Sequence, residues 1–273
     1  MRIFSDANEL KNYLKTQTKT IGFVPTMGAL HEGHLSLIKE AKKQNELVVV
    51  SIFVNPTQFL KGEDFTKYPR KDEADKKICE VAKVDILFMP QISDIYTKDE
   101  PSILAPKVRG YILEGGTRPS HFDGVLSIVM KLLNITSPTN AYFGKKDAQQ
   151  LFLIKQMAKS FFITTNIIAC ETQRDKDALA LSSRNVYLSK DEREIALAIP
   201  KSLRAASELV IKNQRDSKTI VGVMSEILSK TDISYIAIVD REFNPLDTIE
   251  LGNSIILVEA KVGETRLLDN IWL

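Results

Sequence analysis

The sequence predicts an α/β fold, a Rossmann-like doubly wound parallel sheet followed by a second, smaller α+β domain. Up to about residue 172, short apolar runs alternate with stretches whose apolar residues recur at helical spacing. The run "ELVVVSIFVNP" at 46–56 is largely β-branched, which is typical of a strand buried on both faces. After about residue 175, two helical stretches precede strands that follow one another closely. We therefore expect one domain over 1–172 and a smaller C-terminal domain over 173–273.

The first domain begins with the amphipathic stretch "SDANELKNYLK", a predicted helix with Ser5 or Asp6 as its N-cap. The segment "TIGFVPTMG" follows as a strand that Pro25 and Gly28 end. Sheets of this class bind ligands at the carboxyl ends of their strands, so the residues directly after each strand are the candidates for function. The other predicted elements are helix 33–45, strand 46–56, helix 72–82, strand 84–90, helix 122–134, strand 140–144, helix 147–161 and strand 163–170.

The second domain has a different order of elements. Two helical stretches, "SKDEREIALAIPKSLRAASELVIKN" and "RDSKTIVGVMSEILSK", come first. Three apolar runs then lie close together in the chain, so we expect antiparallel strands. These predicted strands are "ISYIAIVD", "SIILVEAKVG" and "TRLLDNIWL".

The composition is that of an ordinary globular protein, with 44% hydrophobic and 26% charged residues. The 37 Lys and Arg residues nearly balance the 35 Asp and Glu residues, so neither nucleic acid nor an anionic membrane is indicated as the main partner. No apolar run approaches the roughly 18 residues of a membrane helix, and the first residues lack a signal-peptide core. We expect a cytoplasmic protein whose two cysteines, Cys79 and Cys170, serve packing, because no Cys-x-x-Cys spacing suggests a metal site or disulfides.

The segment "PTMGALHEGH" at 25–34 leads from a strand through a glycine-containing turn into a helix. A helix start carries unpaired N–H groups and the positive end of the helix dipole, which attract anions. His31 and His34 are three residues apart, so both can face one side of the turn and donate hydrogen bonds to phosphate. Two of the three histidines of the chain lie here. The alternatives are a surface turn with two exposed histidines and a zinc pair, for which no third ligand lies nearby.

The segment "IFVNPTQF" places Asn55 and Gln58 after the strand at 46–56. A glutamine amide has both donor and acceptor atoms, so it can bind a hydroxyl and a carboxylate together. The alternative is a polar turn after Pro56.

The segment "FGKKDAQQ" repeats the pattern of a strand, a glycine and a helix start at Gly144. Lys145 and Lys146 can place positive charge on phosphates, and Asp147 can hold a ribose hydroxyl or a metal. The alternative is a charged helix start with Asp147 at its cap.

The segment "ALALSSRNVYLS" offers the hydroxyls of Ser182 and Ser183 and the fixed charge of Arg184, which suit a phosphate. It lies in the join between the expected domains, a common place for a site. The alternative is an ordinary loop.

The segment "LEGGTRPSHFDGV" contains Arg118 and His121. It either closes over a ligand or is a plain surface loop. The chain has no Walker-A pattern and no G-x-G-x-x-G after a strand, so nucleotide binding would not follow the P-loop route.

These motifs, in this order, resemble those of the pantoate–β-alanine ligase (pantothenate synthetase) family, part of the HxGH nucleotidylyltransferase-like superfamily. The resemblance implies that the carboxylate of pantoate attacks the α-phosphorus of ATP, giving pantoyl adenylate and pyrophosphate. The amine of β-alanine then displaces AMP. It also implies use of Mg²⁺ and a cytoplasmic homodimer. The matching segments are "PTMGALHEGH", "VSIFVNPTQF", "YPR", "LEGGTRPSHFDGV", "FGKKDAQQL", "LSSRN" and, near the C-terminus, "TRLLDNI".

The resemblance also implies roles for single residues. His34 is the implied catalytic histidine with His31 as its companion, and Lys146 and Arg184 complete the catalytic set. Pantoate would be held by Gln58 and Gln150, and β-alanine by Gln58, while 1–172 binds nucleotide and pantoate and 173–273 forms a lid. The implied ATP-binding residues are Met27, Gly28, Ala29, Leu30, His31, Glu32, Gly33, His34, Gly144, Lys145, Lys146, Asp147, Gln173, Leu181, Ser182, Ser183 and Arg184.

Two positions depart from the family pattern: Ala148 stands where many members have an aromatic residue, and Ala178 stands where many have glycine. The acidic stretch "KDEADKK" after "YPR" is a possible metal site, but its spacing is poor, so no metal ligand is assigned. One rival function is transfer of a nucleotidyl group to a phosphate-bearing acceptor, against which Gln58 and Gln150 argue because such an acceptor favours cationic residues. The other rival is a non-catalytic nucleotide-binding regulator.

Overall fold

The computed structural model describes residues 1–273, which form two compact units. Unit 1 comprises 1–145 and 153–171, and unit 2 comprises 146–152 and 172–273. The cut after residue 171 lies beside the domain boundary expected from the sequence. The short segment 146–152, however, belongs to unit 2, although the sequence pattern placed it within the first domain.

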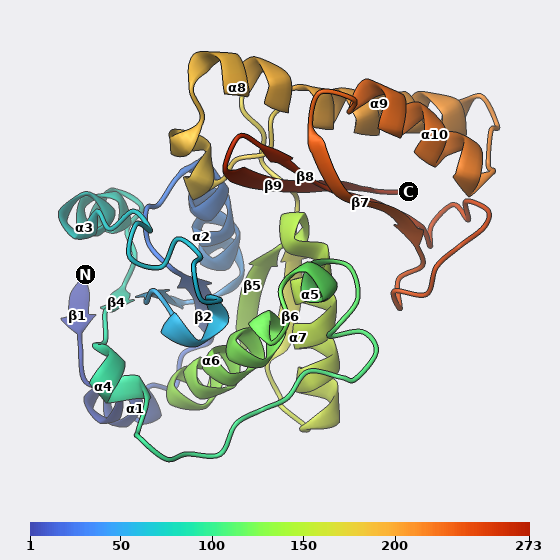
Figure 1. Cartoon of the computed structure of the whole chain (residues 1–273). Helices are drawn as coiled ribbons and strands as arrows, with labels where there is room; N and C mark the ends of the chain where they lie inside the picture. Colours follow the sequence, from blue (N-terminus) through green and yellow to red (C-terminus); the bar gives the residue numbers. More distant parts are fainter. The chain divides into compact units, whose positions relative to one another are not determined.

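Unit 1 contains a six-stranded parallel sheet in the order β1-β4-β3-β2-β5-β6 (Figure 1). Its strands are β1 (Arg2–Phe4), β2 (Ile21–Thr26), β3 (Leu47–Ile52), β4 (Ile86–Phe88), β5 (Asn140–Gly144) and β6 (Asn166–Cys170). The helices between them are α1 (Ala7–Lys15), α2 (Glu32–Gln44), the 3₁₀ turn η1 (Pro56–Gln58), α3 (Asp72–Val81), α4 (Ile92–Ile95), α5 (Glu114–Thr117) and α6 (His121–Thr136). A 3₁₀ turn η2 (Lys145–Asp147) leads into α7 (Ala148–Ser160).

Alternation along the central strands gives the sheet two apolar faces. Val24 and Val50 pack in one cluster with Ile38 of α2 and Cys79 of α3. Phe23, which precedes Val24, is equally buried and points to the opposite face of the sheet, where α6 contacts both β2 and α1. Helices therefore cover both faces, as a doubly wound fold requires.

Unit 2 contains a three-stranded antiparallel sheet in the order β7-β8-β9. Helices α9 and α10 pack on this sheet, with Leu203 and Met224 in one buried cluster with Ile256 and Val258 of β8. The elements are the 3₁₀ turn η3 (Ser183–Tyr187), α8 (Lys190–Ala196), α9 (Ala198–Ile211), α10 (Ser217–Ile227), β7 (Asp232–Val239), β8 (Ile255–Val262) and β9 (Thr265–Trp272).

The fold class expected from the sequence is confirmed, with local differences in individual elements. The single helix expected over 189–213 is two helices, because Pro200 lacks an N–H and its ring conflicts with the carbonyl of Ala196, where α8 ends. The short edge strand β1 was not predicted. Asp6 is confirmed as the N-cap of α1, since its side chain accepts from the N–H of Glu9.

The two cysteines are free and buried. Burial raises the pKa of the Cys79 thiol to about 12 and that of Cys170 to about 11. Both therefore behave as packing residues, as the sequence suggested.

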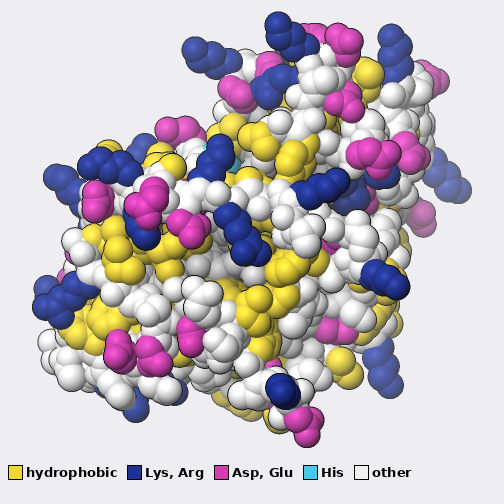
Figure 2. All heavy atoms as spheres, turned by 60° about the vertical axis from the view of Figure 1, so that its left-hand side comes forward, with side chains coloured by type: hydrophobic (Ala, Val, Ile, Leu, Met, Phe, Trp, Pro, Cys, Tyr) yellow, Lys and Arg dark blue, Asp and Glu magenta, His cyan; other side chains and the backbone are white.

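The surface carries both signs of charge. On the face drawn in Figure 2, Lys and Arg side chains are interspersed with Asp and Glu side chains, in line with the near balance of 37 against 35. None of the helices has both the length and the apolar character needed to span a membrane.

Candidate active site

Three of the motifs follow three adjacent strands of unit 1. The histidine turn follows β2, Gln58 follows β3, and Gly144 with Lys145 ends β5. β2 pairs in parallel with β3 on one side and with β5 on the other. Their carboxyl ends therefore meet at one edge of the sheet, as expected for the ligand site of a doubly wound fold.

The imidazole side chains of the histidine turn accept hydrogen bonds from the backbone of the same turn. His31 is the N-cap of α2: its Nδ1 atom accepts from the N–H of Gly33 at 3.1 Å, and the N–H of His31 donates to Nδ1 of His34 at 3.3 Å. The two rings lie with centroids 4.1 Å apart, so they share one side of the turn as the spacing predicted. Since each Nδ1 atom is an acceptor, each neutral ring carries its proton on Nε2. Both Nε2–H groups are therefore suited to donate to an anion.

The backbone before the histidines is held by Asp75, a residue of α3. Its two carboxylate oxygens accept from the N–H groups of Ala29 and Leu30, both at 2.8 Å. Gly28 and Ala29 have φ of 84° and 49°, the left-handed conformation that turns both N–H groups toward the carboxylate. A Cβ atom on Gly28 would lie 3.0 Å from Asp75 Oδ2. Both the positive φ and the lack of space for a side chain therefore favour glycine at this position.

Asp75 is almost fully buried, with 1% of its surface exposed. Burial raises the pKa of its carboxyl, and the bonds from Leu30 and Ala29 act in the opposite direction. Asp75 lies in the acidic stretch "KDEADKK", and its carboxylate oxygens hold the turn. The N–H groups of Ala29 and Leu30 are thus engaged within the protein.

Gln58 lies next to the histidine turn. Its Nε2 atom contacts Sδ of Met27 at 3.2 Å, and its Oε1 atom accepts from Nδ2 of Asn55 at 3.1 Å. Asn55, buried with 1% exposed, also donates to the carbonyl of Gly124. The helix α6 and the turn η1 are so close that a Cβ on Gly124 would lie 2.3 Å from the carbonyl oxygen of Thr57 and 2.6 Å from the nitrogen of Gln58.

Arg118 and His121 hold the other side of the same turn. The Arg118 guanidinium forms a fork with the Glu63 carboxylate, at 2.7 and 2.5 Å, and also reaches Glu114 at 3.3 Å. The carbonyl oxygen of Gln58 accepts from Arg118 at 3.3 Å and from Nδ1 of His121 at 2.8 Å. Arg118 and His121 are 5% and 6% exposed, so this segment is not the plain surface loop that the sequence left open.

The partners of His121 fix its protonation state. The Gln58 carbonyl can only accept, so Nδ1 carries the proton, and Arg118 can only donate, so Nε2, at 3.0 Å, is an acceptor. His121 is therefore neutral. Burial and then the Arg118 charge lower the pKa of His121 from 6.5 to about 4, in agreement with this geometry.

Lys145 is the last predicted site residue of unit 1. It follows Gly144 at the end of β5 and forms an ion pair with Glu171, which follows β6. β5 and β6 are neighbours in the sheet, which brings these two charges together.

In unit 2, Lys146 and Asp147 lie in η2, where the Lys146 ammonium is 3.5 Å from the Asp147 carboxylate. Gln150 is half-buried in the first turn of α7. Ala148, the departure from the family pattern, is buried with 2% exposed. The backbone carbonyl of Lys146 accepts from the side chain of Asn270 at 2.8 Å.

The loop 173–184 of unit 2 folds back on itself. The N–H of Leu181 donates to the carbonyl of Gln173 at 2.9 Å, so two predicted ATP-binding residues are neighbours. Ser182 caps η3 by accepting from the N–H of Arg184 at 3.3 Å. Ala178 has φ of 70° at the tip of the loop, a conformation that glycine adopts more readily.

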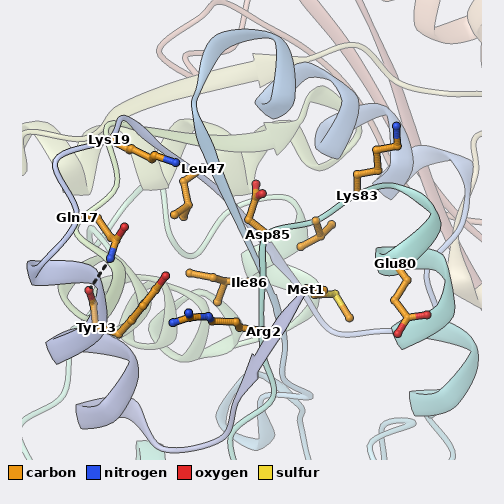
Figure 3. A pocket seen from close by; sticks show the side chains of 11 residues that line it. Met1, Arg2, Tyr13, Gln17, Lys19, Leu47, Glu80, Lys83, Asp85 and Ile86 are labelled. Carbon is orange, nitrogen blue, oxygen red and sulfur yellow. Dashed lines mark hydrogen bonds between the residues drawn. The ribbon is translucent and has the colours of Figure 1, made fainter.

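A hollow of about 640 Å³ lies elsewhere in unit 1 (Figure 3). Its lining includes Arg2, Leu47 and Ile86, which begin strands β1, β3 and β4. It is therefore at the amino ends of the strands, and none of the predicted site residues lines it.

Sequence reasoning missed the supports of the site. Asp75 and Glu63 touch residues of the predicted motifs, but each stands in a segment that is typical of an ordinary polar loop or helix. The sequence did contain one signal for Asp75. It stands three residues before Ile78 and four before Cys79, which places it on the apolar, buried face of an amphipathic helix.

Comparison with known proteins gives matches over the whole chain. The family model described as pantoate-beta-alanine ligase matches residues 2–272. The pantothenate synthetases of Sulfurimonas denitrificans and Helicobacter pylori are 63% and 44% identical, with 100% of both chains covered in each case.

Two solved structures have the same fold. The pantothenate synthetase from Thermus thermophilus has a TM-score of 0.95 at 36% identity, with 99% of each chain covered. The pantoate-beta-alanine ligase from Francisella tularensis, complexed with beta-gamma ATP and beta-alanine, has a TM-score of 0.83 at 40% identity, covering 100% of this chain and 97% of that one.

Proposed function

The chain belongs to the pantoate–β-alanine ligase family, and from that membership we propose that it condenses pantoate with β-alanine at the expense of ATP. The products are pantothenate, AMP and pyrophosphate, and pantoyl adenylate is the intermediate. The observation that supports this most directly is the pairing of two Nε2–H histidines with Gln58 at one edge of the sheet. Such a site combines donors for phosphate with an amide suited to a hydroxy acid.

ATP and β-alanine are proposed as substrates on the strength of the Francisella relative, whose structure was described with beta-gamma ATP and beta-alanine. We place ATP on the histidine turn (Met27 to His34), on Gly144 to Asp147, on Gln173 and on Leu181 to Arg184. Pantoate is assigned to Gln58 and Gln150.

The first step needs alignment more than it needs proton transfer. A carboxylate is ionised near neutral pH, so pantoate attacks the α-phosphorus without a general base. The obstacle is repulsion between two anions. Lys146, Arg184 and the Nε2–H groups of the histidines reduce this repulsion and stabilise the charge that develops on pyrophosphate. Holding the reactants together contributes roughly 7–11 kcal/mol of barrier lowering.

In the second step the neutral amine of β-alanine attacks the acyl carbon, the C–O bond to AMP breaks, and an amide forms. Gln58 lies where pantoate and β-alanine must meet. Its backbone is fixed by His121 and Arg118, and its side chain by Asn55. This rigidity keeps the carboxyl carbon of the intermediate facing the amine, while exclusion of water protects the mixed anhydride.

Mg²⁺ is expected from the family, but the chain has few side chains placed to coordinate it. No group of three or more His, Cys, Asp or Glu side chains is arranged to hold a metal ion. Both oxygens of Asp75 are occupied by N–H groups. We expect the ion to be held mainly by phosphate oxygens of ATP. The steps above use only side chains of this chain. A cytoplasmic homodimer is likewise proposed from the family alone.

A coupled assay for AMP, with each substrate omitted in turn, tests the proposal. We expect AMP only when ATP, pantoate and β-alanine are all present. Exchange of labelled pyrophosphate into ATP should require pantoate but not β-alanine, because adenylate formation precedes the amine. Transfer of AMP to a phosphate-bearing acceptor would favour the nucleotidylyltransferase, and absence of any AMP would favour a non-catalytic nucleotide-binding protein.

A further inference from the structure

The segment "TRLLDNI" of β9 has no role in the reaction described so far. Two of its residues, Asp269 and Asn270, are polar and almost fully buried, with 2% and 3% of their surfaces exposed. Burial of a charge and an amide is costly unless each has well-placed partners. Outside β9, Asp269 bonds Arg174 and Asn270 bonds Lys146, both in unit 2 and both within or next to the segments that the proposed function assigns to ATP.

Asp269 holds the base of the loop 173–181. Its carboxylate forms a two-bond fork with the guanidinium of Arg174, at 2.6 and 2.9 Å. The same guanidinium donates to the carbonyl of Ala178 at 3.1 Å, across the loop. Arg174 directly follows Gln173 and pairs with Ala180 in an antiparallel bridge. One ion pair thus fixes the position of the backbone next to both Gln173 and Leu181.

Asn270 holds Lys146. The Nε1–H of Trp272 donates to Oδ1 of Asn270 at 2.8 Å, and an indole N–H can only donate. The orientation of the amide is thereby settled, and its Nδ2 group donates to the carbonyl of Lys146 at 2.8 Å. Trp272 is itself covered by the Arg241 guanidinium, 4.5 Å from the ring centroid.

We propose that Asp269 and Asn270 are positioning residues for the adenylation step, Asn270 acting through Lys146 and Asp269 acting through Arg174. This inference rests on the proposed function, since it presupposes that Lys146 and the loop 173–184 bind ATP. Two consecutive residues of β9 would then fix the positions of Lys146 and of the loop 173–184 relative to each other.

The test for Asn270 is a double-mutant cycle with Lys146. Asn270→Ala should lower kcat at least tenfold while the KM for pantoate stays within twofold. In the Lys146→Ala background, Asn270→Ala should cause no further loss, because the ammonium that it positions is already gone. The control is Asn244→Ala, which removes an exposed amide that bonds Asp240 in the same unit. It should leave kcat within twofold.

A purely structural role gives a different pattern. Equal fold-losses from Asn270→Ala in both backgrounds would overturn the positioning role and leave the proposed function standing. Wild-type turnover of Lys146→Ala alone would instead overturn the role given to Lys146 in the proposed function. If Asn270→Ala yields no folded protein, Asn270→Ser, which keeps a donor, replaces it in the cycle.

Asp269→Asn tests the proposed role of Asp269, which acts through Arg174. The substitution conserves volume but removes the charge that holds Arg174. We expect the KM for ATP to rise at least fivefold with little change in the KM for β-alanine. An unchanged KM for ATP in folded Asp269→Asn enzyme would overturn the role of Asp269.

Discussion

The imidazole of His121 donates from Nδ1 to the carbonyl oxygen of Gln58, 2.8 Å away, and accepts from Arg118 at Nε2. A predicted substrate-binding residue is thus held by a histidine that can keep this geometry only while neutral. The pKa of His121 is lowered from 6.5 to about 4, chiefly by burial.

This shift predicts a pH dependence of stability. Between pH 6.5 and 4 the unfolded chain binds a proton at His121 and the folded chain does not, so stability falls as pH decreases through this window. From pH 7 to pH 5 the loss should be about 2 kcal/mol. Urea unfolding of the wild type and of His121→Asn measures it. The variant lacks the titrating ring, so an equal pH dependence in both proteins would contradict the prediction.

Gly124→Ala should displace the turn that carries Gln58. The added Cβ would lie 2.3 Å from the Thr57 carbonyl oxygen, well inside van der Waals contact. We expect a loss of about 1–3 kcal/mol in unfolding free energy and a higher KM for pantoate. Gly222→Ala is the matched control, because Gly222 lies in α10 with no atom within 4 Å of the new Cβ. It should stabilise the protein by up to about 1 kcal/mol.

Asp75→Asn should loosen the histidine turn. The amide keeps one acceptor oxygen, but its NH₂ group then faces a backbone N–H, so one of the two bonds to Ala29 and Leu30 is lost. The expected cost is about 1–3 kcal/mol, with a fall in kcat/KM for ATP. Asp72→Asn removes an exposed charge from the first turn of the same helix and should change neither. Equal behaviour of the two variants would show that Asp75 does not hold the turn.

Lys146→Ala should lower the rate of adenylate formation at least about a hundredfold, or about 2.7 kcal/mol, because an ammonium on the phosphates acts mainly in the transition state. Single-turnover formation of pyrophosphate measures the step. Lys159→Ala, an exposed lysine in the last turn of α7, should turn over as the wild type does. Wild-type rates in Lys146→Ala would refute its role.

Gln58→Ala should weaken pantoate binding much more than ATP binding, since the proposed contact of the amide is with the acid and not with the triphosphate. Calorimetric titration with each ligand separates the two affinities. Equal losses for both would mean that the substitution had moved the whole turn, and the specific role of Gln58 would then be wrong.

Much of the fold could be predicted because local patterns coincide with burial. The β-branched run 46–56 contains β3, all of whose residues are buried, and "NAYFG" coincides with β5. β1 was not predicted because it has only three residues, none of them buried, and so shows no hydrophobic alternation. The helix expected over 189–213 is divided at a proline, whose effect depends on its conflict with the carbonyl four residues earlier.

The common position of His31, His34, Gln58 and Lys145 at one edge of the sheet could be predicted because these residues follow strands. Their supports could not, because the contacts of Asp75 with Ala29 and of Arg118 with Glu63 join segments 46 and 55 residues apart in the chain. Likewise, no periodicity indicates that Asn270 reaches Lys146, 124 residues away. Such pairings arise only when strand order brings distant loops together.

The burial of both native thiols makes this chain convenient for labelling. Maleimides react with thiolates. The pKa values of about 12 and about 11 keep Cys79 and Cys170 protonated, and burial keeps both thiols inaccessible. A cysteine introduced at exposed Ser160 in unit 1 and another at exposed Ser229 in unit 2 would therefore accept a donor and acceptor dye without background. Energy transfer between the dyes would then follow, in real time, any movement of one unit toward the other as nucleotide is added.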